Sequence, residues 1–409
     1  MRKLMKSRHS RGSDVALTRI SKKGDRDKNY IGQMIFIALA MLPLVSMMCT
    51  TLWSKVIEST LFTREQREPY SFDWGEAIEM RSHVSAKYNQ LPYLPNGVPR
   101  LSAISVSEYR DLWDSKWPVV ITDVVPTWGA FHWSKDFLFK FYSKSNITVT
   151  QTKGLLKEAE GQVMSLGDFY KLTFDKATAT SWAYATDEHF ISHHAQLKLD
   201  IGTNKYAEED YFSYLPDEVR PKNAMLLWGT KYSRSKLHVD PYNWTGTIAL
   251  LSGTKRWKLW PPNPENTLGL SLRRSGLPLD CPTLVSNRDS FSQMSPAKNG
   301  GGDRLDYSVE FDQKPGDLLF IPTGWAHQAY NVEETIAISS QFMNRNNYKA
   351  VLEEIIKCTD IGPSLPNLFL TLNAEEQVKA VSSLIPQEML ETARQINNAI
   401  KTLLMPEKI

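Results

Sequence analysis

The sequence predicts a mainly β domain with flanking helices, preceded by one transmembrane helix. Three observations support this fold class. The middle third of the chain is rich in Trp, Tyr, Val and Ile runs interrupted by turn residues, which is typical of β-strands. Beyond Asn346, apolar residues recur at steps of three and four, which is typical of helices. Residues 29–54 carry no charged side chain over a length that can cross a bilayer.

The amino-terminal segment predicts a signal anchor. The tail, 1–28, holds ten Lys or Arg residues, and the apolar run 34–53 is long enough to span a hydrocarbon core of roughly 30 Å. Because the positively charged flank stays in the cytosol, we expect a single-pass membrane protein whose remaining chain is luminal, in the endoplasmic reticulum or Golgi, or extracellular. Asn146 would then lie in a glycosylation sequon. A cleaved signal peptide, a buried core helix and a mitochondrial presequence are the alternatives.

The rest of the chain divides into three predicted parts. Residues 55–99 predict a polar stalk that ends in a Pro- and Gly-containing linker. Residues 100–345 predict the folded domain, in which the polar, glycine-containing stretch 261–314 predicts an inserted loop. Residues 346–409 predict a C-terminal helical segment. Its apolar stripe packs against its own domain or, as an alternative, joins subunits into an oligomer.

Within the folded domain, local patterns predict elements in order along the chain. Ser105 and Glu108 have the spacing of a capping box before a helix. Runs of β-branched and aromatic residues predict strands, and the connection 252–254 suits a hairpin. Pro386 is a favourable start for a final helix. The predicted strands are 119–122, 245–251, 255–260, 318–321 and 336–338.

The composition excludes several classes of protein. Of the 409 residues, 42% are hydrophobic and 23% are charged, which excludes wholesale disorder. The net charge of +3 is too small over this length to indicate a nucleic-acid surface. Three cysteines are too few for a four-cysteine zinc site. They still allow one disulfide, between Cys281 and Cys358.

His238 and Asp240 predict two ligands of a metal site. Residues two apart in a strand point to the same side, so the two side chains would enter one cavity. Such a triplet is common by chance, but His327 follows a second predicted strand and offers a third ligand. Two histidines and one carboxylate leave positions open on Fe(II) for a substrate and dioxygen. Catalytic zinc, which uses the same ligands, is the rival interpretation.

Lys255 helps to distinguish an iron oxygenase from a zinc hydrolase. A zinc hydrolase needs a general base beside the metal, whereas an oxygenase needs an organic electron donor and a cation that anchors it. Lys255 opens the return strand of the predicted hairpin, and an inward-pointing lysine is too costly to bury without an anion. An exposed lysine on an edge strand is the alternative.

Several of these motifs together resemble the JmjC family of 2-oxoglutarate-dependent iron oxygenases, over roughly residues 100–345. The stretches concerned are 237–241 (LHVDP), 253–257 (GTKRW), 315–317 (PGD), 321–322 (IP), 324–327 (GWAH) and Asn331. Within that family, the chain is similar to the branch that contains the phosphatidylserine-receptor-like lysyl hydroxylase and the asparaginyl hydroxylase of hypoxia signalling. The resemblance implies a double-stranded β-helix, also called a jelly-roll or cupin barrel.

The resemblance also implies the site. Fe(II) would be bound by His238, Asp240 and His327, and O2 would be the oxidant. The cosubstrate 2-oxoglutarate would be bound by Lys255, Tyr184, Ser235, Asn331 and Ser339. One position departs from the family, because Ile248 stands where relatives have an asparagine. Either its role passes to Asn243, Thr247 or Asn331, or cosubstrate binding is weaker.

The implied activity is hydroxylation of a side chain in a protein or peptide substrate. Demethylation of a methylated nitrogen is an alternative outcome of the same chemistry. A catalytically inactive, membrane-tethered binding protein is an alternative from another class. The intact set of metal ligands argues against this last interpretation.

Overall fold

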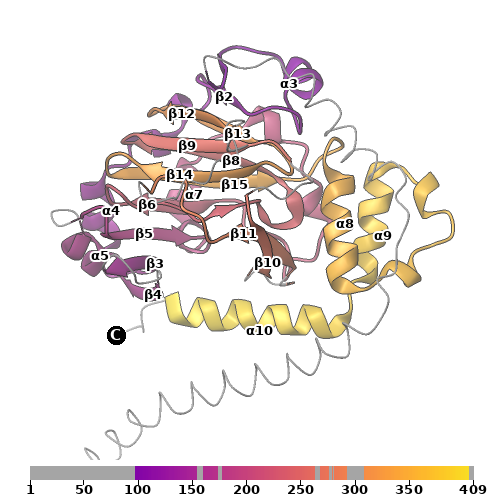
Figure 1. Cartoon of the computed structure of the whole chain (residues 1–409). Helices are drawn as coiled ribbons and strands as arrows, with labels where there is room; N and C mark the ends of the chain where they lie inside the picture. Colours follow the sequence, from indigo (N-terminus) through magenta and orange to yellow (C-terminus); the bar gives the residue numbers. More distant parts are fainter. Residues whose placement is uncertain are drawn as a thin grey trace, which may run out of the picture. The chain divides into compact units, whose positions relative to one another are not determined.

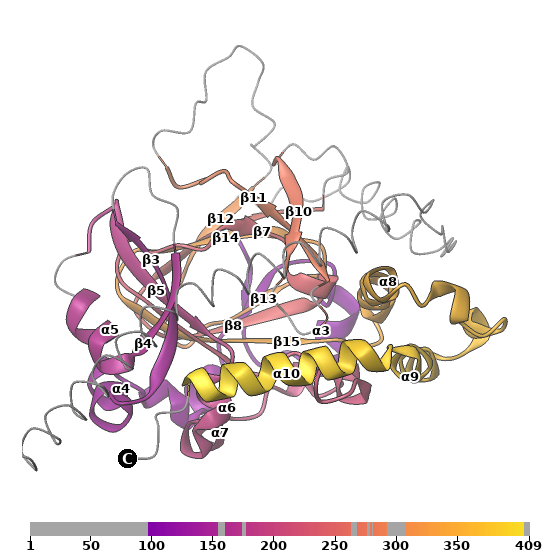
Figure 2. The ribbon, with the colours of Figure 1, turned by 90° about the horizontal axis from the view of Figure 1, so that it is seen from below.

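The structure is a computed structural model that describes residues 97–404 apart from 154–159, 174–176, 263–267, 276–278, 280 and 293–307. The predicted basic tail, the predicted span 29–54 and nearly all of the predicted stalk lie outside the described residues. Within the described part, two β-sheets face each other, with helices around them (Figure 1, Figure 2). The predicted mainly β class with flanking helices is confirmed.

Over the described ranges, the larger sheet has nine strands and the smaller sheet has six. In spatial order, the larger sheet contains β1 (Arg100–Leu101), β2 (Val119–Ile121), β13 (Leu318–Ile321), β8 (Thr245–Ser252), β15 (Thr335–Phe342), β6 (Met225–Gly229), β5 (Ser181–Asp187), β3 (Asn146–Lys153) and β4 (Glu160–Ser165). The smaller sheet contains β10 (Leu270–Arg274), β11 (Pro282–Ser286), β7 (Leu237–His238), β14 (Ala326–Asn331), β9 (Lys255–Trp260) and β12 (Val309–Gln313). Because β8 lies between β13 and β15, strands distant in sequence are neighbours, as in the expected jelly roll.

The central strands of the larger sheet are buried on both faces. In β8, Ile248 and Leu250 face the smaller sheet and pack in one core with Trp257. Ala249 and Leu251 pack in a second core, on the opposite face. Successive side chains of a strand point to opposite faces, so a strand covered on both sides needs apolar residues at every position. This explains the uninterrupted apolar run 248–251 within β8. The core between the two sheets is called the inner core below.

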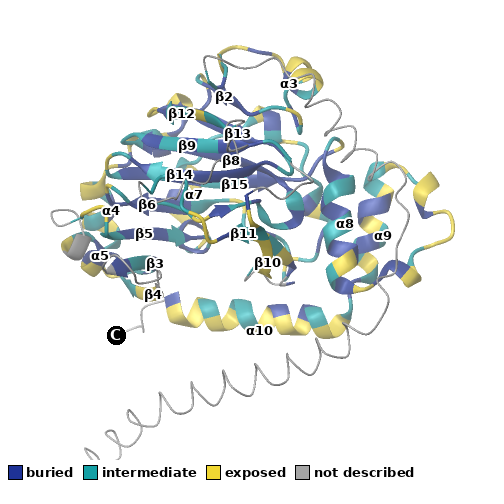
Figure 3. Ribbon diagram, viewed as in Figure 1, coloured by how far each residue is buried: buried dark blue, intermediate teal, exposed yellow. Residues whose placement is uncertain are grey.

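The helices form two groups. The first group packs against the second core, on the outer face of the larger sheet, and consists of α3 (Val106–Leu112), α4 (Lys135–Tyr142), α5 (Leu166–Thr173), α6 (Phe190–His193) and α7 (Ala195–Asp200). The second group has its own core and consists of α8 (Tyr348–Thr359), α9 (Ala374–Leu384) and α10 (Gln387–Leu404). As predicted, Ser105 caps α3 by accepting a hydrogen bond from the Glu108 amide at 3.0 Å, and α10 begins directly after Pro386. Figure 3 shows that much of α10 is exposed.

Strands occupy part of the range that was expected to be an inserted loop, 261–314. β10 pairs with β11, and β11 pairs with β7, which carries His238. The polar composition of this range hid short runs in which apolar residues alternate with polar ones. Cys281, immediately before β11, forms a disulfide with Cys358 of α8. The disulfide therefore links this ribbon to the C-terminal helices.

The predicted localisation needs correction. No helix in the part of the chain that the structure describes combines the length and the apolar character needed to cross a membrane. The prediction of a single-pass membrane protein with a luminal or extracellular domain is contradicted by this finding. The predicted span itself lies outside the described residues. The anchor was expected from the length and hydropathy of residues 34–53 and from the basic segment before them.

Candidate metal centre

His238, Asp240 and His327 converge on one point. His238 of β7 and His327 of β14 are direct partners in the smaller sheet, with their ring centroids 4.3 Å apart. Asp240 follows β7, and its Oδ1 lies 3.6 Å from the Nε2 atom of each histidine. One ligand atom from each side chain lies within 4.8 Å of the other two. Strand pairing thus brings together ligands that are far apart in the sequence.

Backbone carbonyls fix both imidazole rings. Nδ1–H of His238 donates to the carbonyl of Lys236 at 2.7 Å, and Nδ1–H of His327 donates to the carbonyl of Trp325 at 3.1 Å. A carbonyl can only accept, so each ring carries a proton on Nδ1 and directs Nε2 towards the other ligands. This is the usual outer-shell arrangement around metal-binding histidines.

The Asp240 carboxylate fits tightly against the larger sheet. A Cβ atom added to Gly246 of β8 would lie 2.5 Å from Oδ2 of Asp240, so only glycine leaves room for the carboxylate there. Burial alone would raise the pKa of Asp240, but the electrostatic interaction with the two imidazoles and the hydrogen bonds from His238 and Trp244 outweigh it, and the pKa lies below its usual value. The carboxylate is therefore ionised at neutral pH.

The two histidines differ electrostatically. Burial and the neighbouring His238 lower the pKa of His327 to about 4, so this imidazole is neutral and can act as a ligand at neutral pH. Burial also opposes the charged form of His238, but the hydrogen bond and charge of Asp240 outweigh it and raise the pKa of His238. A bound cation would take the place of that proton.

This donor set fits a divalent transition-metal ion. Bonds of about 2.1 Å place neighbouring ligand atoms about 3 Å apart, and small side-chain adjustments bring the 3.6 Å separations to that value. Two histidines and one carboxylate on one side of an ion leave coordination positions open. Among the described residues, no other cluster of His, Cys, Asp or Glu has metal-binding geometry.

Lys255 lies in the inner core at the start of β9. Its side chain is fully buried, and Nζ donates to the Tyr184 hydroxyl at 2.9 Å and to Oδ1 of Asn331 at 2.7 Å. Among the described residues, no carboxylate pairs with this lysine, and burial lowers its pKa to about 7. Since β9 lies between β14 and β12, the edge-strand alternative is excluded. A buried amine with neutral acceptors alone is suited to an incoming anion.

The other residues expected around the cosubstrate are placed differently. Tyr184 and Asn331 contact Lys255, and burial raises the pKa of the Tyr184 phenol, which stays protonated. Ser235 accepts a hydrogen bond from the Ala329 amide at 3.0 Å. Ser339 lies on β15 beside Ile248. Within the described hydrogen bonds, neither serine contacts Lys255.

Ile248 lies in the inner core, at 6% exposure. Of the residues expected to replace the missing asparagine, Asn331 contacts Lys255. Thr247 is adjacent to Ile248 in β8 and therefore points to the opposite face. Asn243 lies in the short turn Pro241–Asn243 after Asp240.

Sequence reasoning missed Gly246 and Trp257. The Trp257 ring lies 5.9 Å from the His327 ring, and Nζ of Lys255 lies 6.0 Å from the Trp257 ring centroid. Trp257 is two residues after Lys255 in β9, so strand periodicity would have placed it on the same face. A glycine inside a predicted strand, as at Gly246, is itself a sign that another group approaches closely.

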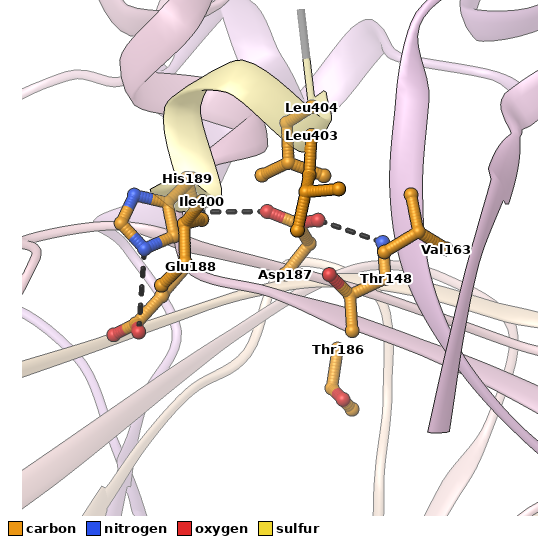
Figure 4. Close-up of a pocket in the computed structure, with 9 residues that line it drawn as sticks. All are labelled: Thr148, Val163, Thr186, Asp187, Glu188, His189, Ile400, Leu403 and Leu404. Atoms are coloured by element: carbon orange, nitrogen blue, oxygen red, sulfur yellow. Dashed lines mark hydrogen bonds and ion pairs between the residues drawn. The ribbon is translucent and has the colours of Figure 1, made fainter. Parts of the chain in front are cut away.

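A separate cavity of about 280 Å³ lies between the last turns of α10 and the strands β3 to β5 (Figure 4). None of the predicted site residues lines it. The Asp187 carboxylate on its floor accepts hydrogen bonds from the backbone amides of Thr148, His189 and Phe190, at 2.7–2.8 Å. These bonds give Asp187 a structural role, since they tie β5 to β3 and to α6.

Comparison with known proteins agrees with this geometry. A model of the cupin-like domain matches residues 105–348, more than half of the chain. The chain is 26% identical over 275 residues to the bifunctional arginine demethylase and lysyl-hydroxylase psr-1 of Caenorhabditis elegans, covering 65% of this chain and 66% of that protein. It is 28% identical over 268 residues to the arginine-specific demethylase JMJ22 of Arabidopsis thaliana, covering 64% and 49%. It is 31% identical over 143 residues to the human 2-oxoglutarate and iron-dependent oxygenase JMJD4, covering 35% and 32%.

The chain spans between 27% and 66% of the length of the first curated relatives that it matches. The cupin-like match covers both β-sheets apart from β1, and it includes all three metal-ligand candidates. These matches confirm the family that the sequence motifs predicted. The chain therefore belongs to the cupin-like domain family, among the JmjC oxygenases.

Proposed function

We propose that this chain is an Fe(II)- and 2-oxoglutarate-dependent dioxygenase that hydroxylates a side chain of a protein substrate. The observation that carries the proposal is the combination of two sites in one barrel. The cluster of His238, Asp240 and His327 has metal-binding geometry, and Lys255 is a buried amine that contacts only neutral acceptors among the described residues. A metal site alone would be compatible with many reactions. A metal site beside a buried anion anchor specifically favours a 2-oxo acid.

The residues have separate roles in this proposal. His238, Asp240 and His327 hold Fe(II), and Lys255 with Tyr184 binds the far carboxylate of 2-oxoglutarate. When bound, iron with 2-oxoglutarate and O2 supplies the oxidation of a substrate C–H bond to C–OH, with release of succinate and CO2. The chain holds the ligands in place through the carbonyls that accept from the two imidazole Nδ1–H groups.

The inner core contributes by excluding water. Trp257, Leu259 and Ile248 are each less than 10% exposed and belong to the same core as Tyr184. A dry apolar wall strengthens the attraction between a buried ammonium and a carboxylate. It also protects reactive species from solvent. The wall therefore serves both cosubstrate binding and the control of oxidation.

The rival zinc hydrolase is less favoured. Such an enzyme needs a general base beside the metal-bound water. Among the described residues, the metal-binding cluster contains Asp240 as its only carboxylate, and this carboxylate serves as a ligand. The buried Lys255 would have no role in hydrolysis. An inactive binding protein is also less favoured, because the complete ligand set would have no function to maintain it.

The names of the relatives indicate the substrate class. Psr-1 is named as an arginine demethylase and lysyl-hydroxylase, and JMJ22 as an arginine-specific demethylase. We therefore propose a lysyl or arginyl side chain of a protein as the substrate. If the oxidised carbon is a methyl group on nitrogen, the hydroxylated product loses formaldehyde, and the outcome is demethylation.

The test is turnover of 2-oxoglutarate by the purified chain. Succinate should form in the presence of Fe(II), O2 and a pool of Lys- and Arg-containing peptides, with and without N-methyl groups. Mass spectrometry then distinguishes the gain of one oxygen from the loss of a methyl group. His327→Ala serves as the inactive control. Absence of succinate with Fe(II), together with peptide hydrolysis that depends on Zn(II), would overturn the proposal in favour of a hydrolase.

A further inference from the structure

Lys255 is held from one side by a chain of hydrogen bonds that leads out of the inner core. Nζ donates to Oδ1 of Asn331 at 2.7 Å, and Nδ2 of Asn331 donates to the Ser233 hydroxyl at 2.7 Å. The Ser233 hydroxyl in turn donates to the backbone carbonyl of Thr230 at 2.6 Å. Lys255, Asn331 and Ser233 are each no more than 1% exposed. Bulk solvent therefore does not contact these three side chains.

The direction of donation fixes the Asn331 amide. Because the Ser233 proton is used on the Thr230 carbonyl, Ser233 can only accept from Asn331. A flipped amide would turn its NH2 group towards the Lys255 ammonium and its carbonyl towards an oxygen with no free proton. Both contacts would then be repulsive. Ser233 thus determines that Asn331 presents an acceptor to the lysine.

The backbone holds Ser233 and Asn331 together. The Asn331 amide donates to the Ser233 carbonyl, and the Tyr232 amide donates to the Asn331 carbonyl, both at 2.8 Å. A Cβ atom on Gly229 would lie 2.0 Å from Nδ2 of Asn331 and 2.5 Å from Oγ of Ser233. Backbone hydrogen bonds therefore hold Ser233 and Asn331 next to each other, and the two side chains pack closely against Gly229.

The lysine keeps one donor for a ligand. An ammonium has three N–H donors, and two described acceptors, Tyr184 and Asn331, contact Nζ. With two donors directed by fixed acceptors, the direction of the third is also fixed. The carboxylate that reaches this donor therefore meets an anchor that is already oriented.

We propose that Ser233 is a positioning residue for the cosubstrate, which through Asn331 orients the Lys255 ammonium towards the far carboxylate of a five-carbon 2-oxo dicarboxylate. The inference rests on the proposed function and adds a residue that touches neither metal nor cosubstrate. The proposed role of Ser233 also bears on Ile248, which stands in β8 where relatives have an asparagine. In this chain Asn331, which Ser233 orients, supplies a polar side chain from β14 instead. Ser233 should matter for ligands with a far carboxylate and for no others.

The experiment compares two ligands by calorimetry on the whole chain loaded with Mn(II). 2-Oxoglutarate has the far carboxylate, whereas pyruvate shares the 2-oxo acid end and lacks it. Ser233→Ala should bind 2-oxoglutarate about tenfold more weakly than the wild type, because one hydrogen bond of a buried network is lost. Its affinity for pyruvate and for Mn(II) should not change. Ser382→Ala is the matched control, since that half-buried hydroxyl also donates to a backbone carbonyl, of Tyr214, at 2.7 Å.

A second variant keeps the proposal testable if Ser233→Ala does not fold. Asn331→Asp keeps the shape of the side chain but gives Lys255 an internal carboxylate and removes the N–H donor to Ser233. It should fold and should bind 2-oxoglutarate at least about tenfold more weakly, with pyruvate binding unchanged. Equal losses for both ligands, or no loss for 2-oxoglutarate, would overturn the inference. A wild-type protein that binds Mn(II) but no 2-oxoglutarate would instead overturn the proposed function.

Discussion

The Asp240 carboxylate lies against the main chain of Gly246, so closely that a methyl group there would come within 2.5 Å of Oδ2. Asp240, which follows β7 of the smaller sheet, is thus packed against β8 of the larger sheet. The orientation of the carboxylate depends on this contact as well as on the hydrogen bond from Trp244. The contact allows the metal site to be perturbed without removing any ligand.

Gly246→Ala should therefore weaken metal binding while the protein stays folded. We expect a loss of about 10- to 100-fold in Mn(II) affinity, which is typical when the support of a ligand is disturbed. Electron paramagnetic resonance of free Mn(II) measures the affinity. Gly161→Ala on β4 is the control, because its added Cβ would have no atom within 4 Å. Equal affinities in both variants would contradict the role assigned to Gly246.

Asp240→Ala should abolish the turnover of 2-oxoglutarate. Removal of the only carboxylate of the cluster leaves two neutral ligands, and we expect turnover to fall by more than about 100-fold. Succinate formation is the measurement. Asp312→Ala removes a carboxylate that pairs instead with Arg256, at 2.7 Å, and should leave turnover near the wild-type rate. Unchanged turnover in Asp240→Ala would rule out this active site.

The affinity for 2-oxoglutarate should decrease as the pH rises above about 7. Burial lowers the pKa of Lys255 to about 7, so below this pH the free protein carries the charged ammonium that attracts the carboxylate. Above it, the neutral amine must first take up a proton, which reduces affinity by up to about tenfold per pH unit. Calorimetry between pH 6 and 9 measures this slope.

Two controls accompany the pH series. Lys255→Met should bind 2-oxoglutarate weakly at every pH and show no slope, since it has no titrating amine. Pyruvate should show no comparable slope in the wild type, because it has no far carboxylate. A steep slope that persists in Lys255→Met would assign the titration to another group.

Reduction of the disulfide between Cys281 and Cys358 should lower the free energy of unfolding. The bond closes a loop with a sequence separation of 77 residues, and loss of such a crosslink typically costs about 2–5 kcal/mol. Thermal unfolding with and without a thiol reductant measures the effect. The double variant Cys281→Ser/Cys358→Ser should unfold at the lower temperature and should not respond to reductant.

Much of the site was predictable because its chemistry is concentrated in short motifs. The spacing of His238 and Asp240 predicted two side chains that enter one site, and the residues around Lys255 and His327 identified the family. What the sequence lacked was the pairing of β7 with β14, which sets the distance between the two imidazoles. Pairing between distant strands is decided by packing, and no local pattern records it.

The contacts of Lys255 were harder to predict from the sequence. Its partners Tyr184 and Asn331 come from β5 and β14, and the resemblance named both without showing that they contact the same amine. Ser233 was missed because it lies in a turn, where serine is common for many reasons. The resemblance named Ser235 and Ser339 as well, and their role in binding the cosubstrate stays a prediction.

The burial of the larger sheet on both faces has a consequence for substitutions in its central strands. In β8, Gly246 lies against Asp240 and Ile248 packs in the inner core, whereas Ala249 and Leu251 pack with the outer helices. Successive side chains of one strand therefore have different neighbours. A change of side-chain volume disturbs first the layer that the residue faces, so the two sides of the strand can be engineered one at a time.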